Sequence, residues 1–119
     1  MVVRRSSAEE VATAVNEVRL RGRLAGVRDE RELPSGDLVV GFRVVVDRDA
    51  GAGGSARVDT LDCAAFRRDV RRKLVGWDPG DEVEVTGALR RRFYRAGAAA
   101  VSRYEVEVRT AVRVARAGS

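Results

Sequence analysis

The amino-acid sequence predicts an all-β protein, a five-stranded Greek-key barrel with one helix between its third and fourth strands. Five segments alternate apolar and polar residues with a period of two, which is typical of strands with one buried face. A single segment has apolar residues three or four positions apart, which indicates an amphipathic helix. Glycine, proline and aspartate lie between these segments and predict the turns that separate them.

The first predicted strand spans residues 15–27. Val18, Leu20 and Leu24 share one face of this strand, and arginines alternate with them on the other face. Residues 28–37 contain a proline and a Ser-Gly pair, and we expect them to form a turn.

The second predicted strand spans residues 38–47, with Phe42 and Val44 on one face. Residues 48–55 are rich in glycine and predict a flexible loop. The third predicted strand follows at residues 56–66.

The predicted helix spans residues 66–77, because the period changes there. Phe66, Val70, Leu74 and Trp77 follow one another at spacings of four, four and three, and so form one helical stripe. We expect Trp77 to lie in the core, whereas Phe66 is either core or a binding residue. The arginines of this segment are expected on the solvated face of the helix, namely Arg67, Arg68, Arg71 and Arg72.

The fourth predicted strand spans residues 82–94. Its inward positions are Val83, Val85, Gly87 and Leu89. Phe93 has the same parity, so we expect it in the core. Arg90, Arg92 and Tyr94 alternate with these positions and leave the opposite face together, so that positive charge and a flat ring lie side by side. Such a face suits a nucleic acid strand, although an ordinary solvated face has the same composition.

Residues 95–102 predict a turn, and residues 103–114 form the fifth predicted strand. Its expected inward positions are Val106, Val108, Thr110, Val112 and Val114. A helix between the third and fourth of five strands is the layout of an OB-fold barrel. An open sheet covered by one helix is the alternative, but closure removes exposed strand edges and favours the barrel.

The length of 119 residues suits one domain, and we assign it to residues 15–114. Residues 1–14 form an N-terminal extension, in which Ser7 and Glu10 suggest a capping box, and residues 115–119 form a C-terminal tail. The net charge of +5 permits a polyanionic partner, but 18 acidic residues dilute this signal.

The composition argues against several classes of protein. The single cysteine, Cys63, cannot form an internal disulfide and is expected to be a small buried residue in a reducing compartment, the cytoplasm. No apolar run is long enough for a membrane span, and no secretory signal is visible. The chain has no histidine, no phosphate-binding loop and no nucleophile or metal motif, so we expect no cofactor, no metal and no enzymatic activity.

Five pieces of the sequence, in the right order around the predicted helix, resemble the bacterial single-stranded DNA-binding protein (SSB) family. The resemblance covers residues 16 to about 114. The pieces are NEVRLRGRL, SGDLVVGFRVVVDR, DTLDCAAF, PGDEVEVTGALRRRFY and RYEVEV. No single piece is specific, but the ordered set is.

The resemblance implies an OB fold that binds single-stranded DNA without reading its sequence, in support of DNA replication, repair or recombination. Phe66 and Tyr94 match two of the family's stacking aromatic residues, and Arg90 and Arg92 match basic residues beside the second. With these, Arg48 and Arg103 are expected to neutralise phosphates. RNA is a further candidate ligand. The family also implies a homo-oligomer, a tetramer or a dimer, in the bacterial cytoplasm in association with the nucleoid.

The chain departs from the family pattern at four places. The glycine-rich loop at residues 49–55 is short and lacks any aromatic residue. Thr60 stands where the family usually has a stacking tryptophan or phenylalanine, the acidic C-terminal tail is absent, and Arg19 and Arg21 lie on an outer face that relatives make more apolar. These departures predict that the chain binds single-stranded DNA more weakly than a relative with the full set of stacking residues. They also leave an alternative open, an OB-fold accessory module that contacts proteins, comparable to primosomal accessory proteins.

Overall fold

The computed structural model describes residues 13–49 and 57–118, and within them it does not describe the side chains of Tyr94 and Ala96. The suggested capping box and most of the glycine-rich loop lie outside the described residues. The elements are β1 (Val18–Ala25), β2 (Arg31–Glu32), β3 (Leu38–Asp47), β4 (Val58–Ala65), α2 (Arg68–Gly76), β5 (Glu82–Ala96) and β6 (Ala99–Ala115). Within the described ranges, no helix has the length and apolar character that a membrane crossing requires.

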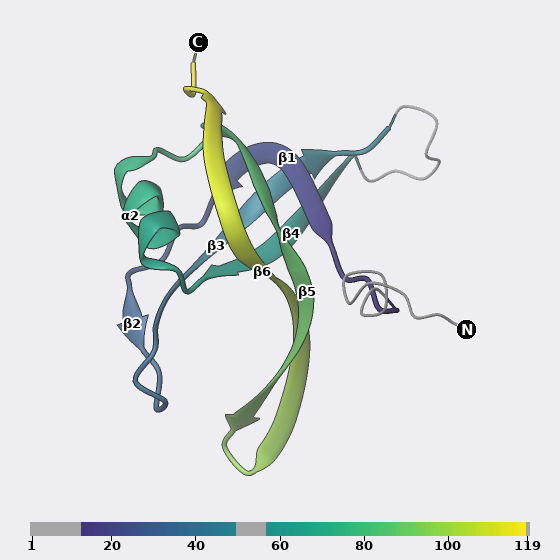
Figure 1. Cartoon of the computed structure of the whole chain (residues 1–119), viewed down its shortest axis with the longest axis vertical. Coiled ribbons are helices and arrows are strands. Elements are labelled where there is room, and N and C mark those ends of the chain that lie inside the picture. The colour runs from purple at the N-terminus through teal and green to yellow at the C-terminus, as the bar shows by residue number, and fades with distance from the viewer. Residues whose placement is uncertain (1–12, 50–56, 119) are drawn as a thin grey trace, which may run out of the picture.

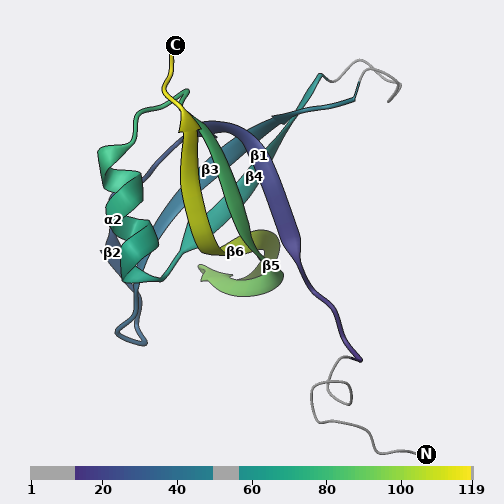
Figure 2. The same ribbon diagram turned by 45° about the horizontal axis from the view of Figure 1, so that its top comes forward.

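The five long strands close into a ring (Figures 1 and 2). Their order is β1–β5–β6–β4–β3, and β1 also pairs with β3, so each long strand pairs with two other long strands. Among the strands of residues 13–49 and 57–118, only β4 and β6 pair in parallel. With α2 between β4 and β5, this arrangement confirms the predicted all-β OB fold. The two-residue strand β2, which pairs with β3, lies in a segment that was predicted only as a turn.

The core fills the ring with aliphatic side chains, Phe42 and Cys63. Helix α2 packs against β3, β4 and β6, and its two buried residues are Val70 and Leu74. Trp77 is partly buried against this cluster, in agreement with the prediction. The helix begins only at Arg68, so Phe66 precedes it and is not part of its buried stripe.

Two glycines allow the strands to approach one another closely where the ring bends. A Cβ atom at Gly22 would overlap the carbonyl oxygen of Val45, and one at Gly87 would overlap the carbonyl oxygen of Glu107. Immediately after Gly22, β1 changes its partner strand from β5 to β3, and Arg23 pairs with both. These glycines therefore mark corners of the barrel.

Strand β6 contains β-bulges that change which of its residues face the core. Thr86 pairs with Thr110, but the next residue, Gly87, pairs with Val108, so β6 has one extra residue there. The predicted inward positions Thr110, Val112 and Val114 are wrong, and all three are exposed. Ala111 is buried instead, because one inserted residue reverses the alternation of faces beyond it.

Beyond the ring, β5 and β6 continue as a long hairpin, which extends away from the barrel in Figure 1. Its turn is limited to Gly97 and Ala98, so the predicted turn over residues 95–102 was too long. Leu89 is exposed, and Phe93 is 72% exposed, so the predictions that they face the core are wrong. Phe93 keeps its alternation, but it lies in the projecting part of the hairpin, where its face has no core to pack against.

Asn16 joins the chain before β1 to the base of this hairpin. Its Nδ2 donates to the carbonyl of Leu89 at 2.8 Å, and the Leu89 N–H donates to its Oδ1 at 2.8 Å. The side-chain amide thus extends the pairing of β1 with β5 beyond the first residue of β1.

Asp81 is the one charged residue among the buried residues of the described chain, at 1% exposure. Its carboxylate accepts the N–H groups of Asp78 at 2.9 Å and Ala117 at 2.7 Å, and it pairs with Arg113 at 3.3 Å. These backbone hydrogen bonds, supported by Arg113, hold the pKa of Asp81 below its ordinary value of 3.8. The carboxylate therefore joins the end of α2 to the end of β6.

We expect Gly22→Ala to lower the free energy of unfolding by about 1–3 kcal/mol, because the new methyl group would displace the Val45 carbonyl from the barrel corner. Gly76→Ala is the matched control, since a Cβ there meets nothing within 4 Å and alanine favours the helix. Urea denaturation of both variants measures the difference. Equal stability of the two variants would contradict the assignment of Gly22 as a corner.

We expect Asp81→Asn to lower stability near neutral pH and to have a smaller effect in acid. A carboxylate with a lowered pKa stabilises the fold above pH 3.8, and this contribution is lost as the pH falls through the folded-state pKa. Urea denaturation of the natural chain and the variant between pH 7 and pH 2.5 tests this. A stability difference independent of pH would show that Asp81 does not act through its charge.

Candidate nucleic-acid interface

A groove of about 780 Å³ runs across one side of the barrel. The connection between β1 and β3, residues 26–37, forms one wall and includes β2. Strands β3 and β4 form the floor, and the base of the β5–β6 hairpin forms the other wall. OB folds bind oligonucleotides on this face, between the equivalent two connections.

Phe66 lies between β4 and α2 and lines the groove with a half-buried ring. The Cζ atom of Arg92 is 5.2 Å from the centroid of this ring, which is within the range of a cation–π interaction. An aromatic ring and a guanidinium group from distant parts of the sequence therefore form one surface inside the groove.

Arg71 holds the backbone at Phe66 in place. Its guanidinium group donates to the Phe66 carbonyl, and its Nε lies 2.7 Å from the carboxylate of Glu30 in the β1–β3 connection. The side chain is only 13% exposed, so the prediction that Arg71 lies on the solvated face of the helix is wrong. Instead, Arg71 links the groove wall to the residue that carries the ring.

Arg92 is fixed by two carboxylates of β6. Its Nε lies 3.1 Å from Glu105, and its Nη2 lies 2.7 Å from Glu107. Burial alone would lower the pKa of Arg92, but the hydrogen bonds to Glu105 and Glu107 offset this and raise the pKa above its usual value. Arg90 also contacts Glu107, at 3.3 Å, so Arg90 and Arg92 leave the same face, as their spacing predicts.

Positive and negative side chains are balanced in the groove. Five arginines and five carboxylates line it, namely Arg28, Arg31, Arg43, Arg92 and Arg103 with Asp29, Glu30, Asp37, Asp62 and Glu105. Some of these form internal pairs, such as Arg43 with Asp62 at 3.4 Å. The groove is therefore a mixed-charge surface around an aromatic ring, and its lining is not strongly basic.

Three of the predicted site residues, Phe66, Arg92 and Arg103, line this groove together. Arg90 lies beside them on the hairpin. Arg48 lies elsewhere, because it follows β3 at the end away from the groove and pairs with Asp59 at 2.8 Å. At about 3.3 Å per residue, it is roughly 16 Å along the chain from Arg43. The side chain of Tyr94 lies outside the described part of the chain, and only its backbone pairing with Val101 is defined.

Sequence reasoning missed three arginines of the groove, Arg28, Arg31 and Arg43. The alternation along β3 could have indicated Arg43, since it lies opposite in parity to the buried Phe42 and Val44. The other two belong to residues 28–37, where the proline and the Ser-Gly pair predict only a turn. That segment is longer than a hairpin connection needs, which is a signal for a loop that folds over the sheet.

The strand ring, the position of the helix and the groove define a protein of the OB-fold class. A family model described as the single-strand binding protein family matches residues 15–115, and the chain therefore belongs to that family. Membership agrees with the expectation that the chain is not an enzyme, because proteins of this family bind DNA and catalyse no reaction.

The fold is also similar to a solved structure, the Plasmodium falciparum SSB complex with ssDNA. The TM-score is 0.68, the sequence identity is 18%, and the match covers 86% of this chain and 96% of the other. No match was found among curated proteins.

Cys63 lies at the floor of the groove, and its thiol is expected to be unreactive in the folded protein. It is buried, and burial, supported by the charges of Asp62 and Glu105, raises its pKa to about 12. We expect negligible reaction with a thiol-specific disulfide reagent at pH 8, and rapid reaction of one thiol per chain in guanidinium chloride. Rapid reaction of the native protein would contradict this placement.

Proposed function

We propose that the protein binds single-stranded DNA in this groove without reading its sequence. The observation that carries the proposal is the Phe66 ring beneath Arg92, on the face of the barrel that OB folds use for oligonucleotides. Its membership in the single-strand binding protein family supports the same conclusion. The P. falciparum SSB of similar fold was solved in complex with ssDNA.

In this proposal, bases stack on Phe66 and the groove arginines contact phosphates. A ring offers its face to any base, so stacking does not depend on sequence. Arg92 and Arg103 lie on the hairpin side of the groove, and Arg28 and Arg31 lie on the opposite wall. The DNA strand would therefore pass between two sets of cations. From the family resemblance, Tyr94 is a second stacking residue and Arg90 an additional phosphate contact. Arg48 would contact the DNA only where the DNA strand extends beyond the groove.

The balance of charge in the groove predicts moderate affinity. Phosphates that contact Arg43 or Arg92 must share these cations with Asp62, Glu105 and Glu107. Repulsion from the carboxylates opposes part of the attraction between arginine and phosphate. We therefore expect stacking to contribute a large share of the binding free energy.

The biological setting that we propose is DNA replication, repair or recombination in the bacterial cytoplasm, with the protein associated with the nucleoid as a homo-oligomer. The outer face of β1 is a poor surface for assembly, because Arg19 and Arg21 are exposed there and both contact Glu84. These arginines hold the pKa of Glu84 below its usual value. A tetramer or dimer would thus use a different face, or would pair through this charge network.

A second candidate function is an OB-fold accessory module that mainly contacts proteins. The observation that favours it is the mixed charge of the groove, because alternating arginines and carboxylates suit a polar polypeptide as well as a polyanion. This candidate predicts weak adhesion to nucleic acid that disappears at physiological salt.

Titration of a fluorescein-labelled oligo(dT) of about 35 nucleotides across a salt series separates the two candidates. We expect submicromolar binding at physiological salt, with a log–log slope of about −0.7 for each phosphate neutralised. Phe66→Leu removes the ring but keeps an apolar side chain, and should weaken binding roughly five- to 150-fold, the equivalent of about 1–3 kcal/mol per stacked base. Binding to oligo(dA) should weaken in the same way.

Arg72→Ala is the matched control, since Arg72 is exposed on the helix and does not line the groove. It should leave affinity almost unchanged. Binding that appears only at low salt, or that is indifferent to Phe66→Leu, would reject the stacking groove and leave the protein-contact module as the better description.

A further inference from the structure

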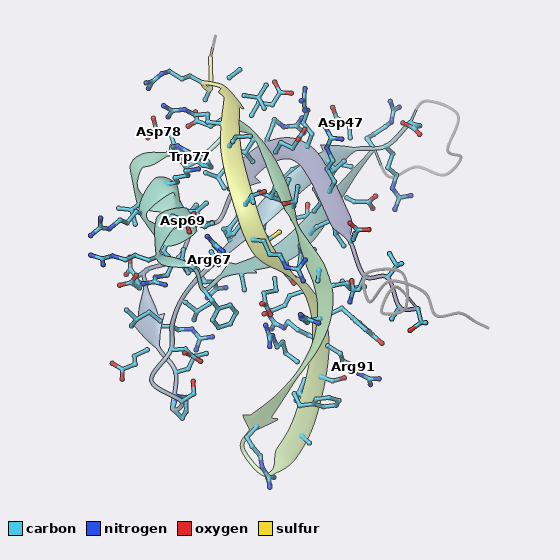
Figure 3. The ribbon with its side chains drawn as sticks, viewed as in Figure 1. Asp47, Arg67, Asp69, Trp77, Asp78 and Arg91 are labelled. Atoms are coloured by element: carbon cyan, nitrogen blue, oxygen red, sulfur yellow. The ribbon has the colours of Figure 1, made fainter. Side chains whose placement is uncertain are left out.

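The β5–β6 hairpin has a second face, opposite to Arg90 and Arg92, which we call the outer hairpin face. In the register of β5 with β6, Arg91 lies opposite Tyr104, Phe93 opposite Ser102, and Arg95 opposite Ala100. Paired residues of two antiparallel strands point to the same side, so these six residues share this face. Figure 3 shows Arg91 on the part of the hairpin that lies beyond the barrel.

The aromatic side chains of the outer hairpin face are ordered around one guanidinium group. The Cζ atom of Arg91 lies 5.3 Å from the centroid of the Phe93 ring and 5.5 Å from that of Tyr104. Its Nη2 donates to the Ser102 hydroxyl at 3.3 Å. Two cation–π contacts and a hydrogen bond therefore hold both rings beside a single positive charge.

Both rings remain open to solvent, because Phe93 is 72% exposed and Tyr104 is 60% exposed. Adjacent aromatic residues at this exposure contribute little to the core, and such patches are typical of binding surfaces. The rings keep most of their area for a ligand even while Arg91 contacts them.

The charge of this face indicates the kind of ligand. Residues 89–104 contain five arginines and no aspartate or glutamate. Within the described residues, no carboxylate forms an ion pair with Arg91 or Arg95, whereas Arg90 and Arg92 on the other face both contact Glu107. The outer face therefore carries uncompensated positive charge beside exposed rings, which suits stacked bases and phosphates better than an apolar protein surface.

We propose that the outer hairpin face is a second contact surface for single-stranded nucleic acid, with bases stacked on Phe93 and Tyr104 and phosphates at Arg91 and Arg95. This proposal rests on the proposed function, since it describes where the DNA strand continues after it leaves the groove. The hairpin is only two β-strands wide, and paired β-strands lie about 4.8 Å apart. A short stretch of the nucleic acid can therefore pass around the edge of the hairpin. The nucleic acid strand would then contact both faces of the same hairpin.

Two lengths of oligo(dT) test the proposal, one of about 8 nucleotides that fills the groove and one of about 35 that extends beyond it. The double variant Phe93→Ser/Tyr104→Ser should weaken binding of the long oligonucleotide at least fivefold and leave the short one unchanged. Arg91→Ser/Arg95→Ser should reduce the salt slope for the long oligonucleotide only. The matched control is Val112→Ser, since Val112 is also exposed on β6 but lies outside the hairpin and does not line the groove.

The outcomes separate this proposal from the proposed function. If the unaltered chain binds neither length, or if Phe66→Leu has no effect, the groove proposal fails. If the groove is intact but the double variant binds both lengths normally, the outer hairpin face is not a nucleic acid surface. A change of oligomeric state in that variant, with DNA binding unchanged, would likewise overturn the proposal and assign the face to contacts between copies of the chain.

A second measurement does not depend on the folding of a variant. Photocrosslinking of the unaltered protein to oligo(dT) that carries 5-iododeoxyuridine should label the peptide with Phe93 or Tyr104 at the long length, and only groove peptides at the short length. Labelling confined to groove peptides at both lengths would reject the proposal.

Discussion

Closure of the strand ring through β1 is the constraint on which the rest of the molecule depends. The strand pairs first with β5 and then with β3, and the Val45 carbonyl fills the space that a side chain would need at Gly22. This closure brings the β1–β3 connection over the floor of the barrel and opposite the base of the hairpin. The two walls of the groove are thus a consequence of where one strand changes its partner.

The two faces of the β5–β6 hairpin carry different electrostatics although they alternate residue by residue. On the groove side, Glu105 and Glu107 orient Arg92 over Phe66 and neutralise much of its charge. On the outer side, Arg91 is held by rings and a hydroxyl, and no carboxylate of the described residues pairs with it. Carboxylates thus fix the geometry of one face, and aromatic rings fix that of the other.

The fold could be predicted from the sequence because most of its strand segments alternate apolar and polar residues and its helix has one clear stripe, Val70 and Leu74. The failures are local and physical. A β-bulge adds one residue to β6 and reverses the faces of Val112 and Val114, and alternation alone does not indicate such an insertion. Phe93 was misplaced because alternation gives a face but not whether a core lies beneath it. Phe66 and Arg92 could be nominated separately, but their contact depends on tertiary structure.

The contact of Arg71 with Glu30 and with the Phe66 carbonyl has a consequence for the entropy of binding. The groove wall and the ring are anchored to the same half-buried side chain of α2, so they are ordered together before any ligand arrives. A preorganised site loses less conformational freedom on association than one whose loops must first be fixed. The helix thereby contributes to affinity without offering a surface to the ligand.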